Sequence, residues 1–128
     1  MTKTAFLFAG QGAQYLGMGR ELYDQYAIVK ETIDQASKVL GYDLRDLIDN
    51  DETKLNQTRY TQPAILATSV AIYRLLKEKG YQPDMVAGLS LGEYSALVAS
   101  GALDFEDAVA LVAKRGAYME EAAPAGSG

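Results

Sequence analysis

The chain has 128 residues, of which 48% are hydrophobic and 23% charged, and this composition is typical of one globular domain with a buried core. A net charge of −5 argues against nucleic-acid binding, and no apolar run is long enough to span a membrane. The absence of cysteine excludes disulfides and thiolate metal sites, and the absence of histidine removes the usual base of a serine nucleophile. With no signal-peptide pattern, the simplest expectation is a cytoplasmic protein that binds neither nucleic acid nor membrane.

The first predicted element is a strand over Thr4–Ala9, a continuous apolar run of the kind found in the centre of parallel sheets. It ends at the glycine-rich turn Gly10-Gln11-Gly12. This turn lacks the lysine of a phosphate-binding loop and the third glycine of a dinucleotide-binding turn. Two interpretations stay open: a backbone N–H donor for an oxyanion, or an ordinary tight turn.

Two helices are predicted next, over 18–26 and 27–40. Apolar residues of the second helix recur at a spacing that places them on one face. These residues are Val29, Ile33, Ala36 and Leu40. Gly41 is expected to end this helix, because glycine readily adopts the left-handed conformation found just beyond a helix C-terminus.

The segment after Gly41 is predicted to hold little regular structure. Asp43 can cap one short helical turn that runs to Ile48. Residues 49–61 are mainly polar, so we expect a loop whose acidic residues form a solvated surface.

A long helix is predicted over Pro63–Lys79, with Pro63 at its first position and Gly80 just beyond its end. The helix is apolar around much of its circumference, so it should be deeply buried. Gln62 directly precedes it, and a polar amide at this place is either a cap or a pocket residue.

The stretch Gly88-Leu89-Ser90-Leu91-Gly92 follows the short apolar strand Met85–Ala87 and precedes a helix rich in alanine and leucine. This Gly-x-Ser-x-Gly pattern is typical of a nucleophile elbow, a sharp turn from strand to helix that presents the serine hydroxyl. Gly88 and Gly92 lack the Cβ atoms that would collide at such a turn. Ser90 is therefore the candidate nucleophile, although an ordinary turn with a solvated serine has the same pattern.

The last predicted helix begins at Asp104 and runs to about Ala122. Its apolar stripe contains Arg115, and a guanidinium on a buried face needs a partner. The stripe is formed by Phe105, Ala108, Val112, Arg115 and Met119. Three interpretations stay open for Arg115: an ion pair with an acid such as Glu93, a side chain that reaches to solvent, or a fork for a substrate carboxylate.

Four motifs resemble those of the malonyl-CoA:acyl-carrier-protein transacylases of bacterial fatty-acid synthesis, and of the acyltransferase domains of polyketide synthases. The motifs are Phe8–Gln14, Tyr60–Ala64, Gly88–Tyr94 and Lys114–Gly116. The resemblance covers nearly the whole chain and implies an α/β fold. Residues 1–128 would form the N-terminal portion of an α/β-hydrolase-like large subdomain with parallel strands and flanking helices. The family's ferredoxin-like small subdomain is absent from this stretch.

The resemblance also implies roles for individual residues. Ser90 would carry the malonyl group as a covalent ester, and the backbone N–H groups of Gln11 and Leu91 would form the oxyanion hole. Arg115 would pair with the free malonyl carboxylate, and Gln62 would line the substrate pocket. The acyl group would pass from malonyl-CoA to the phosphopantetheine thiol of acyl carrier protein, with no metal or other cofactor.

The sequence departs from the family at two points. Leu89 stands where many relatives have a histidine before the serine, and the family's catalytic histidine falls beyond Gly128. We therefore expect the 128-residue chain alone to be inactive. One alternative is a catalytically incomplete fragment or engineered module that keeps the fold and weak acyl-CoA binding. Another is a serine hydrolase of the wider α/β-hydrolase type, which leaves Arg115 unexplained.

Only two strands are evident in the sequence, and both have the composition of buried strands. A sheet usually needs about four to six strands to bury such faces. We therefore expect exposed strand edges and an open apolar face, which favour self-association or pairing with a missing C-terminal segment.

Overall fold

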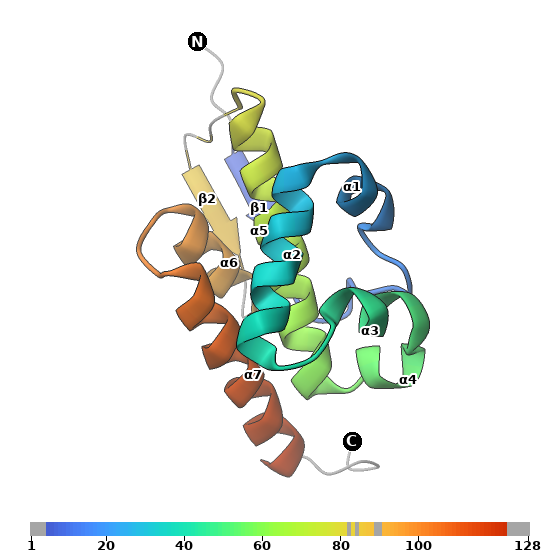
Figure 1. Ribbon diagram of the computed structural model, residues 1–128. Helices are drawn as coiled ribbons and strands as arrows, with labels where there is room; N and C mark the ends of the chain where they lie inside the picture. Colours follow the sequence, from blue (N-terminus) through green and yellow to red (C-terminus); the bar gives the residue numbers. More distant parts are fainter. Residues whose placement is uncertain (1–4, 82, 84, 89–90, 123–128) are drawn as a thin grey trace.

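The computed structural model of the protein describes residues 5–81, 83, 85–88 and 91–122. Within these residues, two parallel strands pack against helices, which confirms the expected α/β class (Figure 1). In chain order, the elements are β1 (Ala5–Phe8), α1 (Arg20–Gln25), α2 (Ala27–Leu40), α3 (Leu44–Asn50), α4 (Glu52–Leu55), α5 (Thr58–Glu78), β2 (Met85–Gly88), α6 (Leu91–Ala99) and α7 (Phe105–Ala122). No helix in the described ranges is long and apolar enough to cross a membrane.

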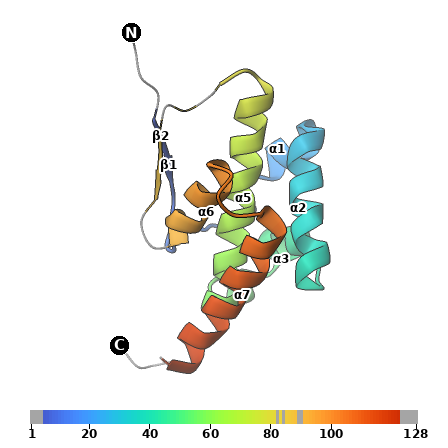
Figure 2. The same cartoon turned by 90° about the vertical axis from the view of Figure 1, so that its left-hand side faces the viewer.

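Among the residues that the structure describes, the sheet formed by β1 and β2 is covered on one side only. The helices of the described residues lie on the same side of the two parallel strands (Figure 2). On that side, Phe6 and Phe8 pack edge-on against Tyr73 of α5, at ring-centroid distances of 6.0 and 6.2 Å. On the opposite side, Leu7 is 81% exposed. The open apolar face that the sequence predicts for a sheet of only two strands is therefore present at Leu7, because no second layer covers the sheet within the described residues.

The core lies between the helices α2, α5 and α7, with α5 in contact with α2, α6 and α7. In α2, the predicted apolar stripe is confirmed, since Val29, Ile33 and Ala36 are each at most 3% exposed. Leu40, at the end of the same stripe, is half-buried and packs against the core. The helix ends as predicted at Gly41, whose φ of 84° is left-handed.

The helix α5 begins at Thr58 rather than at Pro63, so the predicted start is wrong. A proline inside a helix removes one backbone N–H, whose partner here would be the carbonyl of Arg59. Residues Thr61–Ala67 are all buried, so tertiary packing offsets the lost hydrogen bond. As a result, Gln62 lies inside a buried helix and is not a cap at its head.

The loop predicted over 49–61 is also wrong, because α3 continues to Asn50 and α4 follows it. Asp43 caps α3 as predicted, and Asp51 caps α4. Each carboxylate accepts a hydrogen bond at 3.1 Å from the backbone N–H three residues later. These short helices depend on caps and on a few buried side chains such as Leu55, so their sequences show no long apolar stripe.

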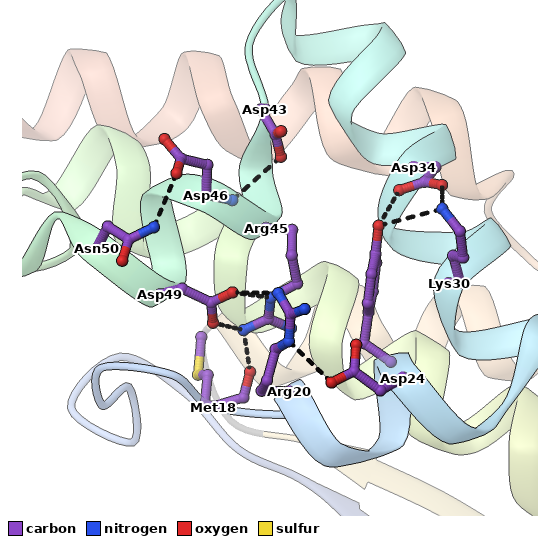
Figure 3. Close-up of polar contacts among 11 residues, drawn as sticks. Met18, Arg20, Asp24, Lys30, Asp34, Asp43, Arg45, Asp46, Asp49 and Asn50 are labelled. Carbon is purple, nitrogen blue, oxygen red and sulfur yellow. Dashed lines mark hydrogen bonds and ion pairs between the residues drawn. The ribbon is translucent and has the colours of Figure 1, made fainter.

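Asp49 joins two arginines between α1 and α3 (Figure 3). Its carboxylate accepts hydrogen bonds from Arg45 Nη2 at 2.7 Å and from Arg20 Nη1 at 2.8 Å. Arg45 is only 4% exposed, and it also donates to the carbonyl of Met18 at 2.7 Å. The prediction that the acidic residues of 49–61 form a solvated surface is therefore wrong for Asp49. Its side chain is 15% exposed and holds α1 against α3.

The helix α7 crosses the first turn of α5 at close range. A Cβ atom on Gly116 would lie 2.7 Å from both the Cα atom of Arg59 and the carbonyl oxygen of Thr58. Beside this crossing, Glu120 accepts hydrogen bonds from the backbone N–H of Arg59 at 2.7 Å and from its Nε at 2.6 Å. The absence of a side chain at Gly116 thus lets α7 approach α5.

Replacing Asp49 with asparagine should destabilise the fold by about 1.5–3 kcal/mol at neutral pH, the usual contribution of hydrogen bonds to charged groups. Burial by itself raises the pKa of Asp49, but hydrogen bonds from Arg45 and Arg20 outweigh burial and lower that pKa overall. The stabilisation is therefore complete above the unfolded-state pKa of about 3.9, and is lost as the pH falls through the lower folded-state pKa.

Urea unfolding of the wild type and of Asp49→Asn, at neutral pH and at about pH 3, measures this effect. The difference between their free energies of unfolding should shrink at the lower pH. As a matched control, Asp24→Asn changes a carboxylate whose side chain is 53% exposed and should cost less than about 1 kcal/mol. A difference that is the same at both pH values contradicts the role given to the Asp49 carboxylate.

Replacing Gly116 with alanine should lower stability by about 1–3 kcal/mol, because the new Cβ overpacks the crossing of α7 over α5. A loss of stability would be specific to the close crossing, since alanine in place of glycine normally stabilises a helix by about 1 kcal/mol. Thermal unfolding followed by circular dichroism measures it, with Lys114→Ala as the control at an exposed position of the same helix. A higher Tm for Gly116→Ala contradicts the close crossing.

Candidate active site

The strand β2 and the helix α6 are separated by only two residues and meet at two glycines. A Cβ atom on Gly88 would collide with the backbone of Gly92, and one on Gly92 would collide with the carbonyl oxygen of Phe8 at the end of β1. Close backbone approach therefore requires both glycines, as the elbow pattern predicts. The candidate nucleophile Ser90 and its neighbour Leu89 lie outside the described residues.

The two candidate oxyanion donors belong to segments that this packing brings together. Leu91 is the first residue of α6 and is 1% exposed. Gln11 lies in the turn after β1, where Gly12 has a φ of 106° that favours glycine. The end of β1 lies against the first turn of α6 at Gly92, so the turn and the helix N-terminus are neighbours. The role of Gln11 and Leu91 as donors stays a prediction.

The other two predicted site residues are joined to Gln11 by a chain of side-chain hydrogen bonds. Arg115 Nη1 donates to Gln62 Oε1 at 2.7 Å, and Gln62 Nε2 donates to Gln11 Oε1 at 3.3 Å. The chain ends on α5, where Gln11 Nε2 donates to Thr58 Oγ1 at 3.2 Å. The structure therefore brings together Gln11, Gln62 and Arg115, which are far apart in the sequence.

Gln62 lies at the centre of this chain and is 1% exposed. Its nitrogen also lies 3.4 Å from the sulfur of Met119 on α7. A buried amide is costly unless both its oxygen and its nitrogen have partners, and here both do. Gln62 thus keeps the guanidinium of Arg115 and the turn after β1 in a defined arrangement.

Arg115 differs from the expectation in its burial. The predicted stripe of α7 is buried at Phe105, Ala108 and Val112, but Arg115 is half-buried and Met119 is 40% exposed. The stripe therefore leaves the core near the C-terminal end of the helix. The guanidinium carbon of Arg115 lies 5.5 Å from the ring centroid of Tyr94, and Glu93 next to Tyr94 is exposed.

A groove of about 520 Å³ opens at this end of α7, beside the first turns of α6. Its lining residues are Tyr94, Leu111, Lys114, Arg115, Tyr118, Met119 and Ala122. Most of the lining is apolar, and the guanidinium of Arg115 and the ammonium of Lys114 supply positive charge. Such a surface suits a ligand that combines a short apolar body with an anionic group.

Sequence reasoning missed two residues of this region. Tyr94 lies in α6, four residues after Ser90 in the sequence. Gly116 directly follows Arg115 in the fourth motif. Neither residue belongs to a recognised charged or nucleophile pattern, so only the packing of α6 and α7 reveals what each one touches.

Among curated proteins, the chain is 54% identical over 129 residues to the malonyl CoA-acyl carrier protein transacylase of Bacillus subtilis (strain 168). It is 52% identical over 130 residues to the malonyl CoA-acyl carrier protein transacylase of Escherichia coli (strain K12). Both alignments cover 100% of this chain, but only 41% and 42% of those proteins. The chain therefore spans about two fifths of the length of the curated relatives that it matches.

Solved structures agree with this relationship. A crystal structure of MCAT from Streptococcus pneumoniae matches with a TM-score of 0.94 and 92% identity, over 95% of this chain and 40% of that chain. A malonyl-transacylase in complex with a type II PKS acyl-carrier protein matches with a TM-score of 0.92 and 50% identity, over 96% of this chain and 40% of that chain. The acyl transferase domain family matches over residues 5–128, so this chain belongs to that family.

Proposed function

We propose that residues 1–128 form the N-terminal portion of the large subdomain of a malonyl-CoA:acyl-carrier-protein transacylase. The whole protein transfers a malonyl group from malonyl-CoA to the phosphopantetheine thiol of acyl carrier protein. The observation that carries this proposal is the hydrogen-bonded chain from Gln11 through Gln62 to Arg115, beside the elbow and at the edge of the groove. The names of the relatives supply the same substrate and carrier.

The reaction proceeds in two acyl transfers. The hydroxyl of Ser90 attacks the thioester carbonyl of malonyl-CoA, gives its proton to a general base, and displaces the CoA thiolate, which takes up that proton. The thiol of acyl carrier protein then attacks the seryl ester, and its proton returns to Ser90 as the product leaves. This chain contains no histidine, and the resemblance places that base beyond Gly128.

The negative charge that develops on the carbonyl oxygen needs donors that are in place before the reaction. The backbone N–H groups of Gln11 and Leu91 take this role. The turn after β1 and the N-terminus of α6 are neighbours, which supports their pairing. The positive end of the α6 dipole adds to the same stabilisation.

Arg115 binds the free carboxylate of the malonyl group. A guanidinium forms two parallel hydrogen bonds with a carboxylate, which adds both affinity and orientation. Its neutral neighbour Gln62 supports this role, since an amide positions the guanidinium without cancelling its charge.

The protein works in the cytoplasm and uses acyl carrier protein as its partner. A relative solved as a complex with an acyl-carrier protein supports this choice of partner. Self-association, or pairing of the sheet with a further segment, also stays a prediction. The exposed side chain of Leu7 on the open face of the sheet supports it.

Incubation of the full-length protein with malonyl-CoA should leave one malonyl group on Ser90, because the carrier thiol that removes it is absent. Intact-mass spectrometry and peptide mapping measure this adduct. Ser90→Ala should remove the adduct, while the control Ser100→Ala, at an exposed serine just after α6, should keep it. An unmodified Ser90 in an otherwise active protein rejects the proposed role of Ser90 as the nucleophile.

Replacing Arg115 with alanine should cost malonyl transfer about 2–4 kcal/mol, because the substrate carboxylate then lies unpaired in the pocket. Acetyl transfer, which has no such carboxylate, serves as the internal control and should change little. The ratio of kcat/KM for malonyl-CoA to that for acetyl-CoA measures the effect. Equal losses for the two substrates reject the carboxylate role.

A further inference from the structure

The ring of Tyr94 lies under the guanidinium of Arg115, across the contact between α6 and α7. The distance from the guanidinium carbon to the ring centroid is 5.5 Å, within the range of cation–π interactions. Tyr94 is half-buried and packs against the core, so the position of its ring is well defined. Both residues line the same groove.

A hydrogen bond and a ring contact therefore act on the same guanidinium. The oxygen of Gln62 accepts a hydrogen bond from Nη1 of Arg115 at 2.7 Å, which fixes the place of one nitrogen of the group. The ring of Tyr94, with its centroid 5.5 Å from the guanidinium carbon, restricts rotation of the rest of the group. Since an arginine side chain has many rotamers, fixing the plane in advance lowers the entropy lost when a ligand binds.

Tyr94 is also close in the sequence to the candidate nucleophile. Tyr94 comes three residues after Leu91, which begins α6, and four residues after Ser90 in the sequence. The ring thus connects the guanidinium to the helix that starts directly after the candidate nucleophile. In a malonyl thioester, only one methylene separates the carboxylate from the reacting carbonyl. So short a substrate tolerates little error in the spacing between the two groups that hold it.

We propose that Tyr94 is a positioning residue, whose ring holds the guanidinium of Arg115 in the orientation that meets the malonyl carboxylate. This inference rests on the proposed function and names a further determinant of its specificity. The ring face carries the effect and the phenol hydroxyl does not. Phenylalanine in place of Tyr94 should therefore keep the orientation of Arg115, whereas an aliphatic side chain should lose it.

The test measures kcat and KM for malonyl-CoA and for acetyl-CoA in the full-length protein. Tyr94→Phe should keep the malonyl-to-acetyl ratio of kcat/KM. Tyr94→Leu should lower that ratio by about 2- to 30-fold, the range expected for loss of a cation–π contact. Tyr81→Leu is the matched control, because Tyr81 is 60% exposed and follows α5 outside the groove, and it should leave the ratio unchanged.

A double-mutant cycle separates positioning from a general structural role. In the Arg115→Ala background, Tyr94→Leu should change the ratio no further, because the group that the ring orients is gone. Equal losses of malonyl and acetyl transfer, or the same fall in ratio with and without Arg115, overturn the inference. Tyr94→Met fills the space without a ring and replaces Tyr94→Leu if the Tm of that variant shows that it does not fold.

Failure of the proposed function gives a different result. A wild-type protein that transfers no malonyl group rejects the function, and the inference about Tyr94 with it. A wild type that prefers malonyl through Arg115, with an unchanged ratio in Tyr94→Leu, rejects the positioning role alone.

Discussion

The candidate site depends on the hydrogen bonds of the buried Gln62 amide. Leaving such a group without partners costs about 1–3 kcal/mol, so a 1% exposed glutamine requires both an acceptor and a donor. Arg115 donates to its oxygen and Gln11 accepts from its nitrogen. These partners are 53 and 51 residues away in the sequence, so the amide gains both of them only when α7 and the turn after β1 are in place.

Glycines set the backbone distances that make this arrangement possible. Gly92 lets the first turn of α6 lie against the end of β1, and Gly116 lets α7 lie against the first turn of α5. The ion pair of Arg20 and Asp49 holds α1 against α3 in a separate region. The contacts that hold α1 against α3 therefore lie apart from the residues that line the groove.

Patterns within one element were sufficient for much of the fold. The 3.6-residue periodicity of 27–40 and of the helix after Asp104 predicted α2 and α7, because one face of each helix packs on the core. The Gly-x-Ser-x-Gly pattern predicted the sharp turn from β2 to α6. Residue chemistry also identified Gln62 and Arg115 as unusual, since polar groups on buried faces need partners.

Sequence by itself thus determined most helix and strand types and the glycines of the elbow, which follow from local geometry and composition. The resemblance to the family supplied the roles expected of the candidate site residues. Only the tertiary structure decided the start of α5 before Pro63 and the short helix α4 within 49–61. It also decided that Tyr94 lies under Arg115. Each of these depends on what a neighbouring element covers or contacts, and no pattern along a single element contains that information.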